Sequence, residues 1–224
     1  MSKLYLVPTP IGNLGDMTFR AVEVLKSVDL ILAEDTRQAA KLLNHFNIKS
    51  TLQSHHMYNE HRSVEAVCGR IIAGETVALI TDAGTPGISD PGFLIVRESI
   101  RKGIAVETLP GPTALIPALV NSGLPCERFC FEGFLPPKKG RNKRMTSLAE
   151  ETRTMVFYES PFRLVKTLEE LAVILGPERE ACVSRELSKI YEENLRGTLS
   201  SLAAHFSNKA PKGEIVIVVA GKKD

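Results

Sequence analysis

The sequence predicts an α/β protein made of two α/β domains, the first built around a parallel sheet. Short runs such as Asp29–Ala33 and Thr76–Ile80 are apolar on both faces, which is typical of buried parallel strands. Amphipathic stretches alternate with these runs, and this alternation predicts right-handed βαβ units. The pattern of expected strands and helices changes after Gly123. We therefore expect domains at residues 1–118 and 119–224.

In the first domain, helix starts and stops can be placed from single residues. Asp16 and Thr18 offer helix-start chemistry, whereas Gly74 and Gly103 follow helical stretches as stop signals. Pro117 is expected to kink a helix that opens near Thr113. The elements expected here, in chain order, are a strand at Lys3–Val7, a helix ending near Ser27, a strand at Asp29–Ala33, helices at Thr36–Phe46 and Arg62–Ala73, a strand at Thr76–Ile80, a helix at Phe93–Lys102 and a strand at Ile104–Leu109.

The second domain is expected to hold more strands between fewer helices. Gly176-Pro177 ends one predicted helix, and the final apolar strand should be central in its sheet because both of its faces are apolar. The expected elements are strands at Arg128–Phe134, Thr154–Tyr158, Glu180–Ser184, Tyr191–Thr198 and Gly213–Gly221, with helices reaching Glu151 and at Phe162–Leu175 and Leu199–Phe206.

Composition indicates a cytosolic globular protein. Of the 224 residues, 43% are hydrophobic and 24% charged, and the longest apolar runs are too short to span a bilayer. The N-terminus lacks the long apolar segment of a signal peptide. The four cysteines form no Cys-x-x-Cys pair, so a reducing compartment is expected.

Positive charge is concentrated in one segment. The chain has a net charge of +2, and without five basic residues of this segment it would be net negative by three. Such a focus of charge fits contacts to RNA phosphates, although a solvated loop is the plain alternative. We expect an exposed loop there, with RNA-binding candidates Lys138, Lys139, Arg141, Lys143 and Arg144.

The best candidate for a ligand site is the loop Asp82–Gly92, which follows a buried strand. Its eleven residues include three Gly, two Pro, two Asp, one Ser and one Thr, more special chemistry than a turn requires. Glycines allow close approach of the backbone to a ligand, and prolines hold the loop rigid. Open α/β sheets bind ligands at the carboxyl ends of their strands, where this loop would lie.

Other strand-end loops are weaker candidates. Pro8–Gly15 has Gly-x-x-Gly spacing instead of the dinucleotide fingerprint, and its prolines remove N–H donors. Glu34-Asp35 could face a substrate or simply cap the next helix. Thr113 could offer free N–H groups at a helix start. The cluster His55–His61 does not match known metal spacings, so no metal is expected.

Several of these motifs together resemble one family in order and spacing. The chain is similar to the tetrapyrrole-methylase superfamily, the class III methyltransferases, and within it to ribosomal RNA methyltransferases. The likeness runs essentially from end to end. The motifs that carry it are Pro8–Asp16, Ala33–Arg37, Asp82–Gly92, Leu109–Pro112, Gly133–Pro136 and Tyr158–Pro161.

The resemblance implies S-adenosylmethionine held folded in a cleft between two domains. It also implies a homodimer that methylates the ribose 2′-oxygen of a cytidine in the decoding region of 16S ribosomal RNA, with no membrane or DNA partner. The implied cofactor contacts are Ala83, Gly84, Thr85, Pro86, Ile88, Ser89, Thr113, Ala114, Tyr158, Glu159, Arg185, Gly213 and Glu214.

The sequence leaves the catalytic base and the reaction class open. A ribose hydroxyl needs a base within hydrogen-bond reach, and we favour Asp35 and Glu34 over His55 and Glu159. The sulfonium already activates its methyl group, so no metal is required. Two alternatives remain: methylation of a small tetrapyrrole-like molecule, and a non-catalytic RNA-binding module.

Overall fold

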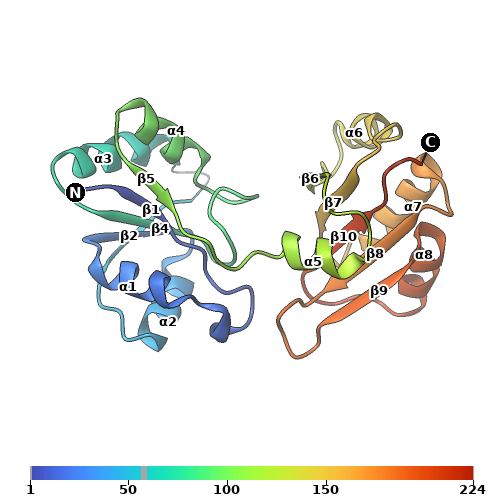
Figure 1. Cartoon of the computed structure of the whole chain (residues 1–224), viewed down its shortest axis with the longest axis horizontal. Coiled ribbons are helices and arrows are strands. Elements are labelled where there is room, and N and C mark those ends of the chain that lie inside the picture. The colour runs from blue at the N-terminus through green and yellow to red at the C-terminus, as the bar shows by residue number, and fades with distance from the viewer. Residues whose placement is uncertain (1, 57–59, 224) are drawn as a thin grey trace. The chain divides into compact units, whose positions relative to one another are not determined.

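The computed structural model describes residues 2–56 and 60–223, without the side chains of residues 60–62, and it shows two compact units (Figure 1). The first is Met1–Thr113 and the second Ala114–Asp224. We expected the boundary after residue 118, which lies inside helix α5 (Leu115–Ser122). That helix packs against strands of the second sheet, so the chain divides before α5.

The first unit contains a five-stranded sheet whose strands all run parallel, as the sequence predicts. The order is β3-β2-β4-β1-β5. Two adjacent strands, β2 and β4, are buried at every position, in agreement with their apolar sequences. The strands are β1 (Leu4–Leu6), β2 (Leu30–Ala33), β3 (Thr51–Ser54), β4 (Val77–Ile80) and β5 (Val106–Thr108).

Helices cover both faces of this sheet, so alternate residues of each strand enter different cores. Leu30 and Leu32 of β2 pack in the core beneath α3 and α4, whereas Ile31 and Ala33 pack in the core beneath α1 and α2. Figure 1 shows these helix pairs on opposite sides of the strands. The helices are the 3₁₀ turn η1 (Leu14–Asp16), α1 (Phe19–Ser27), α2 (Thr36–His45), α3 (Glu60–Ile72) and α4 (Phe93–Arg101).

The second unit contains a mixed five-stranded sheet in the order β6-β7-β10-β8-β9. Only β6 and β7 are parallel, and the other neighbours are antiparallel. The last strand lies in the middle and is buried throughout, which confirms its predicted central place. The strands are β6 (Phe129–Phe134), β7 (Thr154–Glu159), β8 (Glu180–Arg185), β9 (Glu193–Thr198) and β10 (Ile215–Val219).

The helices of the second unit are divided between the faces of this sheet. Helices α6 (Arg141–Ser147), α7 (Leu164–Leu175) and α8 (Leu199–Asn208) share one large core with alternate residues of β7, β8 and β10. The remaining helix of this unit, α5, packs against strands of the same sheet but lies outside that core. Within the described residues, no helix is both long and apolar enough to cross a membrane.

Strand β6 is irregular. Phe131 lies opposite Val156 of β7, but the next paired residue is Gly133, opposite Phe157, so Glu132 is an extra residue in a β-bulge. Phe134 then lies opposite Tyr158. Val156 and Tyr158 are two residues apart and face the same side of the sheet, so Phe131 and Phe134 do as well.

Candidate functional site

Three loops at the carboxyl ends of β1, β4 and β5 are joined by hydrogen bonds into one platform. Thr9 and Gly84 exchange backbone hydrogen bonds, with both N–O distances 2.9 Å. The Thr9 hydroxyl donates to the Thr81 carbonyl at 2.9 Å, and the Thr85 hydroxyl donates to the Pro112 carbonyl at 3.2 Å. The predicted ligand loop is therefore fixed on both sides.

Close packing also joins the first and third loops. A Cβ atom at Gly111 would lie 2.8 Å from Cβ of Pro8, closer than real side-chain carbons approach each other. Gly111 is thus required because only a residue without a side chain lets the two proline-containing loops meet. The platform is built by backbone fit as well as by hydrogen bonds.

The loop Asp82–Gly92 forms two turns within this platform. The Ile88 amide donates to the Thr85 carbonyl at 3.2 Å, and the Gly87 amide donates to the Pro91 carbonyl at 3.1 Å. Ile88 and Ser89 are exposed at its tip. Ser89 has φ of 64°, a left-handed conformation that is strained for a residue with a side chain and that is enriched at ligand sites. The predicted contacts at positions 83–86, 88 and 89 thus lie in one loop that is held by its own hydrogen bonds.

Asp35 follows β2 and joins the same edge, but its carboxylate is used locally. Its amide donates to Asp82 Oδ1 at 3.2 Å. Its side chain caps α2 by accepting from the Arg37 amide at 2.8 Å, and it pairs with the Arg37 guanidinium at 2.7 Å. These hydrogen bonds from Arg37 lower the pKa of Asp35 to about 2. Of the two roles that the sequence allows for Asp35, the helix cap fits the geometry. Because its pKa is so low, Asp35 is a poor proton acceptor.

Glu34, by contrast, belongs to a group of acids with raised proton affinity. Burial, together with the charge of Asp82, raises the pKa of Glu34 above its ordinary value. Burial, followed by the charges of Glu34 and Asp82, raises the pKa of Asp90 to about 7. Sequence reasoning did not single out Asp90 as a chemical group. Its place in the ligand loop was visible, but its burial beside two other acids depends on the fold.

His55 does not fit the role of base. It lies just after β3, is completely buried, and its Nδ1 is 2.9 Å from the Ser63 hydroxyl. Its amide donates to the Ala33 carbonyl at 2.8 Å, continuing the pairing of β2 and β3. The rest of the His55–His61 cluster includes residues 57–59, which lie outside the described residues.

Two further cofactor candidates lie where the units are divided. Thr113 is the last residue of the first unit and directly follows Pro112, the acceptor of the Thr85 hydroxyl. Ala114 begins the second unit and precedes α5, without a side-chain cap.

In the second unit, the sheet brings most of the remaining candidates to one end. Ile215, the first residue of β10, lies opposite Glu159 of β7 and Arg185 of β8. Gly213 and Glu214 directly precede it. The sequence could not show this meeting, because it depends on three strands of mixed direction.

The carboxylate of Glu159, another candidate base, is engaged within the second unit. Its side chain is only 1% exposed. It pairs with Arg163 at 2.7 Å and accepts hydrogen bonds from the Thr167 hydroxyl and the Ser160 amide, each at 2.7 Å. The oxygens of this buried carboxylate are thus occupied by donors of its own unit, and Glu159 serves the fold.

Arg185, Gly213 and Glu214 are also engaged within the unit. Arg185 pairs with Glu193 at 2.7 Å. The Glu214 amide donates to Glu186 Oε1 at 3.0 Å, and a Cβ atom at Gly213 would overlap that same carboxylate. Gly213 is therefore explained by this close approach, and its backbone is the part left for a ligand.

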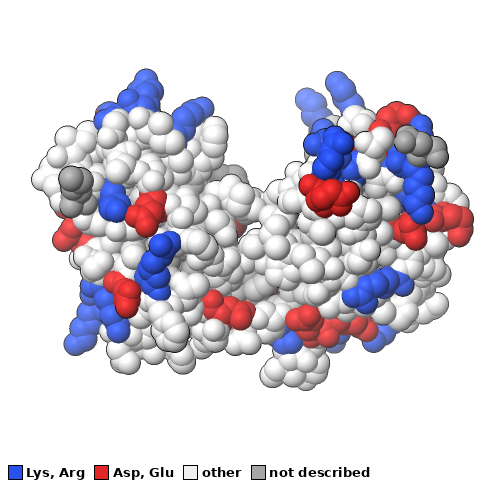
Figure 2. Space-filling model, viewed as in Figure 1, with Lys and Arg blue, Asp and Glu red and all other residues white. Residues whose placement is uncertain are grey.

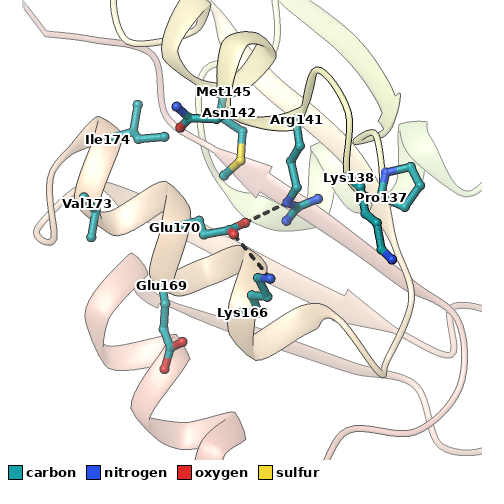
Figure 3. A pocket seen from close by; sticks show the side chains of 10 residues that line it. All are labelled: Pro137, Lys138, Arg141, Asn142, Met145, Lys166, Glu169, Glu170, Val173 and Ile174. Atoms are coloured by element: carbon teal, nitrogen blue, oxygen red, sulfur yellow. Dashed lines mark hydrogen bonds and ion pairs between the residues drawn. The ribbon is translucent and has the colours of Figure 1, made fainter.

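The basic segment divides into two classes, and the prediction of one exposed loop is wrong. Its second half forms α6, and Arg141 is buried (Figure 3). Arg141 bonds Glu170 and the Thr167 hydroxyl, each at 2.7 Å, and also lies 4.0 Å from Glu159. Arg141 is thus a structural residue and not an RNA contact.

Arg144 is also paired, with the carboxylate of the bulge residue Glu132. Lys138, Lys139 and Lys143 are exposed, and no hydrogen bond or ion pair joins their side-chain amines to other described residues. We call these three the loop lysines, although Lys143 lies in the first turn of α6. Figure 2 shows Lys and Arg side chains gathered at the end of this unit where Figure 1 draws α6.

A groove of about 480 Å³ lies between α6 and α7 (Figure 3). Met145, Val173 and Ile174 form its apolar part. Glu170 lies between Arg141 and Lys166, which are 2.7 Å and 3.9 Å from its oxygens. Arg141, Lys166 and Glu170 are thus paired with one another, and the charged residues Lys138 and Glu169 also line the groove.

Comparison of the sequence with known proteins finds a matching family and similar relatives. Residues 3–203 match the model of the tetrapyrrole (corrin/porphyrin) methylases. A ribosomal RNA small subunit methyltransferase I of Synechocystis sp. is 51% identical, covering 99% of this chain and 80% of that protein. The same-named protein of Thermotoga maritima is 46% identical over the whole of both chains.

A solved structure supports the fold. The uroporphyrin-III C-methyltransferase of Thermus thermophilus, solved in complex with S-adenosylhomocysteine, superposes with a TM-score of 0.66 at 20% identity, over 97% of each chain. The predicted α/β fold class and the resemblance are thereby confirmed: the chain belongs to the tetrapyrrole (corrin/porphyrin) methylase family.

Proposed function

We propose that this chain is an S-adenosylmethionine-dependent methyltransferase of small-subunit ribosomal RNA. The observation that carries the proposal is the identity of 46–51% to proteins named ribosomal RNA small subunit methyltransferase I over essentially the whole chain. The platform of three joined loops supports it, because methyl transfer from a sulfonium depends mainly on holding the reactants in line.

The residues of the first unit fit S-adenosylmethionine. The ligand loop exposes Ile88 and Ser89 at its tip. The charge of Asp82 raises the pKa of Glu34, and the charges of Glu34 and Asp82 raise the pKa of Asp90. A sulfonium cation would relieve that repulsion. We propose the cofactor contacts at residues 83–86, 88, 89, 113 and 114. The proposed contacts in the second unit are Tyr158, Arg185, Gly213 and Glu214, with Glu159 supporting them from the core.

We propose Glu34 as the group that accepts the proton of the substrate hydroxyl. It lies at the edge of the platform, is half-buried, and its raised pKa gives it the proton affinity that a base requires. Asp35, the other favoured candidate, caps α2 and positions the loop through Asp82.

The finer proposal is methylation of the ribose 2′-oxygen of a cytidine in the decoding region, by a homodimer in the cytosol. Labelled cofactor, purified protein and small ribosomal subunits lacking this methyl group would test it. We expect 2′-O-methylcytidine after nuclease digestion and mass spectrometry. Cofactor binding without methyl incorporation into RNA would contradict the RNA proposal, and light scattering would measure the oligomeric state.

The same assay separates the two alternatives. Methyl transfer to a porphyrinogen, with none to ribosomal subunits, would favour the small-molecule reaction that the family description suggests. Binding of subunits without any transfer of methyl would favour a non-catalytic module. Neither alternative accounts for the relatives' shared name as directly as RNA methylation does.

A further inference from the structure

The carboxyl ends of β6 and β7 carry aromatic rings that the protein does not bury. Phe162 is 96% exposed on the turn after β7, and Phe134 is 55% exposed at the end of β6. Most exposed apolar side chains need no explanation singly, but these two belong to adjacent parallel strands. Their strand ends therefore lie at the same edge of the sheet.

A specific contact joins the two segments that carry the rings. Arg163, the neighbour of Phe162, donates from Nη1 to the carbonyl of Leu135, the neighbour of Phe134, at 3.5 Å. The same guanidinium is fixed by the buried carboxylate of Glu159 at 2.7 Å. Both aromatic residues thus lie next in sequence to a residue that is held by the ion pair of Arg163 with the buried Glu159.

The bulge in β6 places Phe134 on an aromatic face. Tyr158 contacts Phe131 edge to face at a ring distance of 4.9 Å, and Phe134 at 5.6 Å. If all six residues of β6 paired regularly with β7, without a bulge, Phe134 would lie opposite Glu159, on the buried face. Phe134 is therefore the exposed outer ring of a packed aromatic row.

The loop lysines begin four residues after Phe134. Four extended residues span at most about 14 Å, so Lys138 lies within a few nucleotides' reach of that ring. Arg141 holds the following helix, and its Nη1 also donates to the Pro136 carbonyl at 3.4 Å. Unpaired positive charge and exposed rings thus share one fixed end of the unit.

We propose that this end is a binding surface for single-stranded RNA, with Phe134 and Phe162 stacking on unpaired bases and the loop lysines contacting phosphates. Rings beside free cations are the combination that single-stranded nucleic acids select, because every base offers a flat face and every nucleotide a charge. This inference rests on the proposed function and extends it from the reacting nucleotide to its neighbours.

The test compares two probes that have the same phosphates. One is a single-stranded oligocytidylate, and the other is an abasic ribose-phosphate oligomer of equal length. We expect Phe162→Ala and Phe134→Ala each to weaken binding of the oligocytidylate roughly 5- to 150-fold. Binding of the abasic oligomer should not change. Phe162→Tyr and Phe134→Tyr, which keep a ring, should retain the affinity.

Phe19→Ala is the matched control, because Phe19 is 91% exposed in the other unit. It should change neither affinity. Equal losses on both probes, or none on either, would overturn the stacking proposal, and thermal melting would show that each variant is folded. If the wild-type protein transfers no methyl to ribosomal subunits, the proposed function is contradicted. The comparison of the two probes still tests whether the two rings stack on unpaired bases.

Discussion

Glu34 and Asp35 are neighbours in sequence whose carboxylates have different chemical properties. Asp35 is held as an anion by Arg37, whereas burial and Asp82 favour the protonated form of Glu34. The sequence identified the pair but could not separate its members, because an N-cap and a substrate-facing acid use the same residue types.

The two roles predict that substitution of Glu34 lowers the rate of methyl transfer, whereas substitution of Asp35 lowers stability. Glu34→Gln should lower kcat roughly 10²–10⁴-fold with little change in cofactor affinity, because an amide cannot accept the proton. Asp35→Ala should lower Tm by removing the cap, with kcat largely kept. Single-turnover methylation and thermal melting would measure both. A full loss of kcat in Asp35→Ala would reverse the assignment.

Asp90 should make stability fall as the pH rises. Its pKa is raised in the folded chain from the ordinary value of 3.8 to about 7, so the folded state holds this proton more tightly than the unfolded state. That contribution is complete below pH 4 and is lost between about pH 4 and 7. Asp90→Asn should thus raise Tm at pH 7.5 by roughly 2–4 °C, for about 1 kcal/mol after allowance for solvent screening.

At pH 4 the same variant should show no such gain. Calorimetry over this range would provide the measurement, and a gain of equal size at both pH values would contradict the linkage.

The acids should also favour a cationic ligand over a neutral one. S-adenosylmethionine carries a sulfonium charge that S-adenosylhomocysteine lacks. Asp82→Asn should therefore weaken binding of the first several-fold more than binding of the second, because the coupling is electrostatic. Isothermal titration would measure both, and equal weakening would show that the charge of Asp82 does not act on the sulfonium.

At the scale of elements, the sequence predicted what depends on local pattern. Strand β10 was placed centrally because it is apolar on both faces, and the strand-end loops were grouped because parallel strands end at one edge. Strand β3 was missed, because Thr51–Ser54 is polar and is a strand only through its pairing with β2.

The predictions from sequence fail for residues whose contact partners lie far away in the chain. Arg141 looks like its basic neighbours, but Glu170 and Thr167 on α7 bury it, and they are 29 and 26 residues away. The approach of Gly111 to Pro8 has the same origin. Such contacts follow from the folded arrangement and leave no periodic signal in the chain.

Helix α6 should depend on Arg141 for its attachment. Arg141→Met removes one partner of a buried network and leaves Glu159 and Glu170 less compensated, so we expect a loss of about 3–5 kcal/mol. Lys222→Met breaks an exposed pair with Glu150 and should cost at most about 1 kcal/mol. Denaturant unfolding of the two variants would compare them, and similar small losses would show that the network contributes little.

For the whole molecule, charge location matters more than net charge. The net charge of +2 depends on a few cations, and without the loop lysines it would be −1. Arg141 and Arg144 are used inside the second unit, so the charge available to phosphates is smaller than the sequence indicated.

Replacing all three loop lysines by Ala should weaken binding to ribosomal subunits and reduce its salt dependence. Each lost phosphate contact on a single strand lowers the log–log slope by about 0.7, so a change of about 2 is expected. Arg144→Ala serves as the comparison, with a change below about 0.7 expected because its cation is paired with Glu132. An unchanged slope in the triple variant would show that RNA binds elsewhere.

The extra residue in β6 makes the strand tolerant of one specific loss of length. Five positions of β6 pair with β7, although the strand contains six residues. Removing Glu132 would close the bulge with Phe134 still opposite Tyr158, and it would also remove the carboxylate that pairs with Arg144. A one-codon deletion would therefore keep the outer aromatic ring in place while it removes the carboxylate contact to Arg144 of α6.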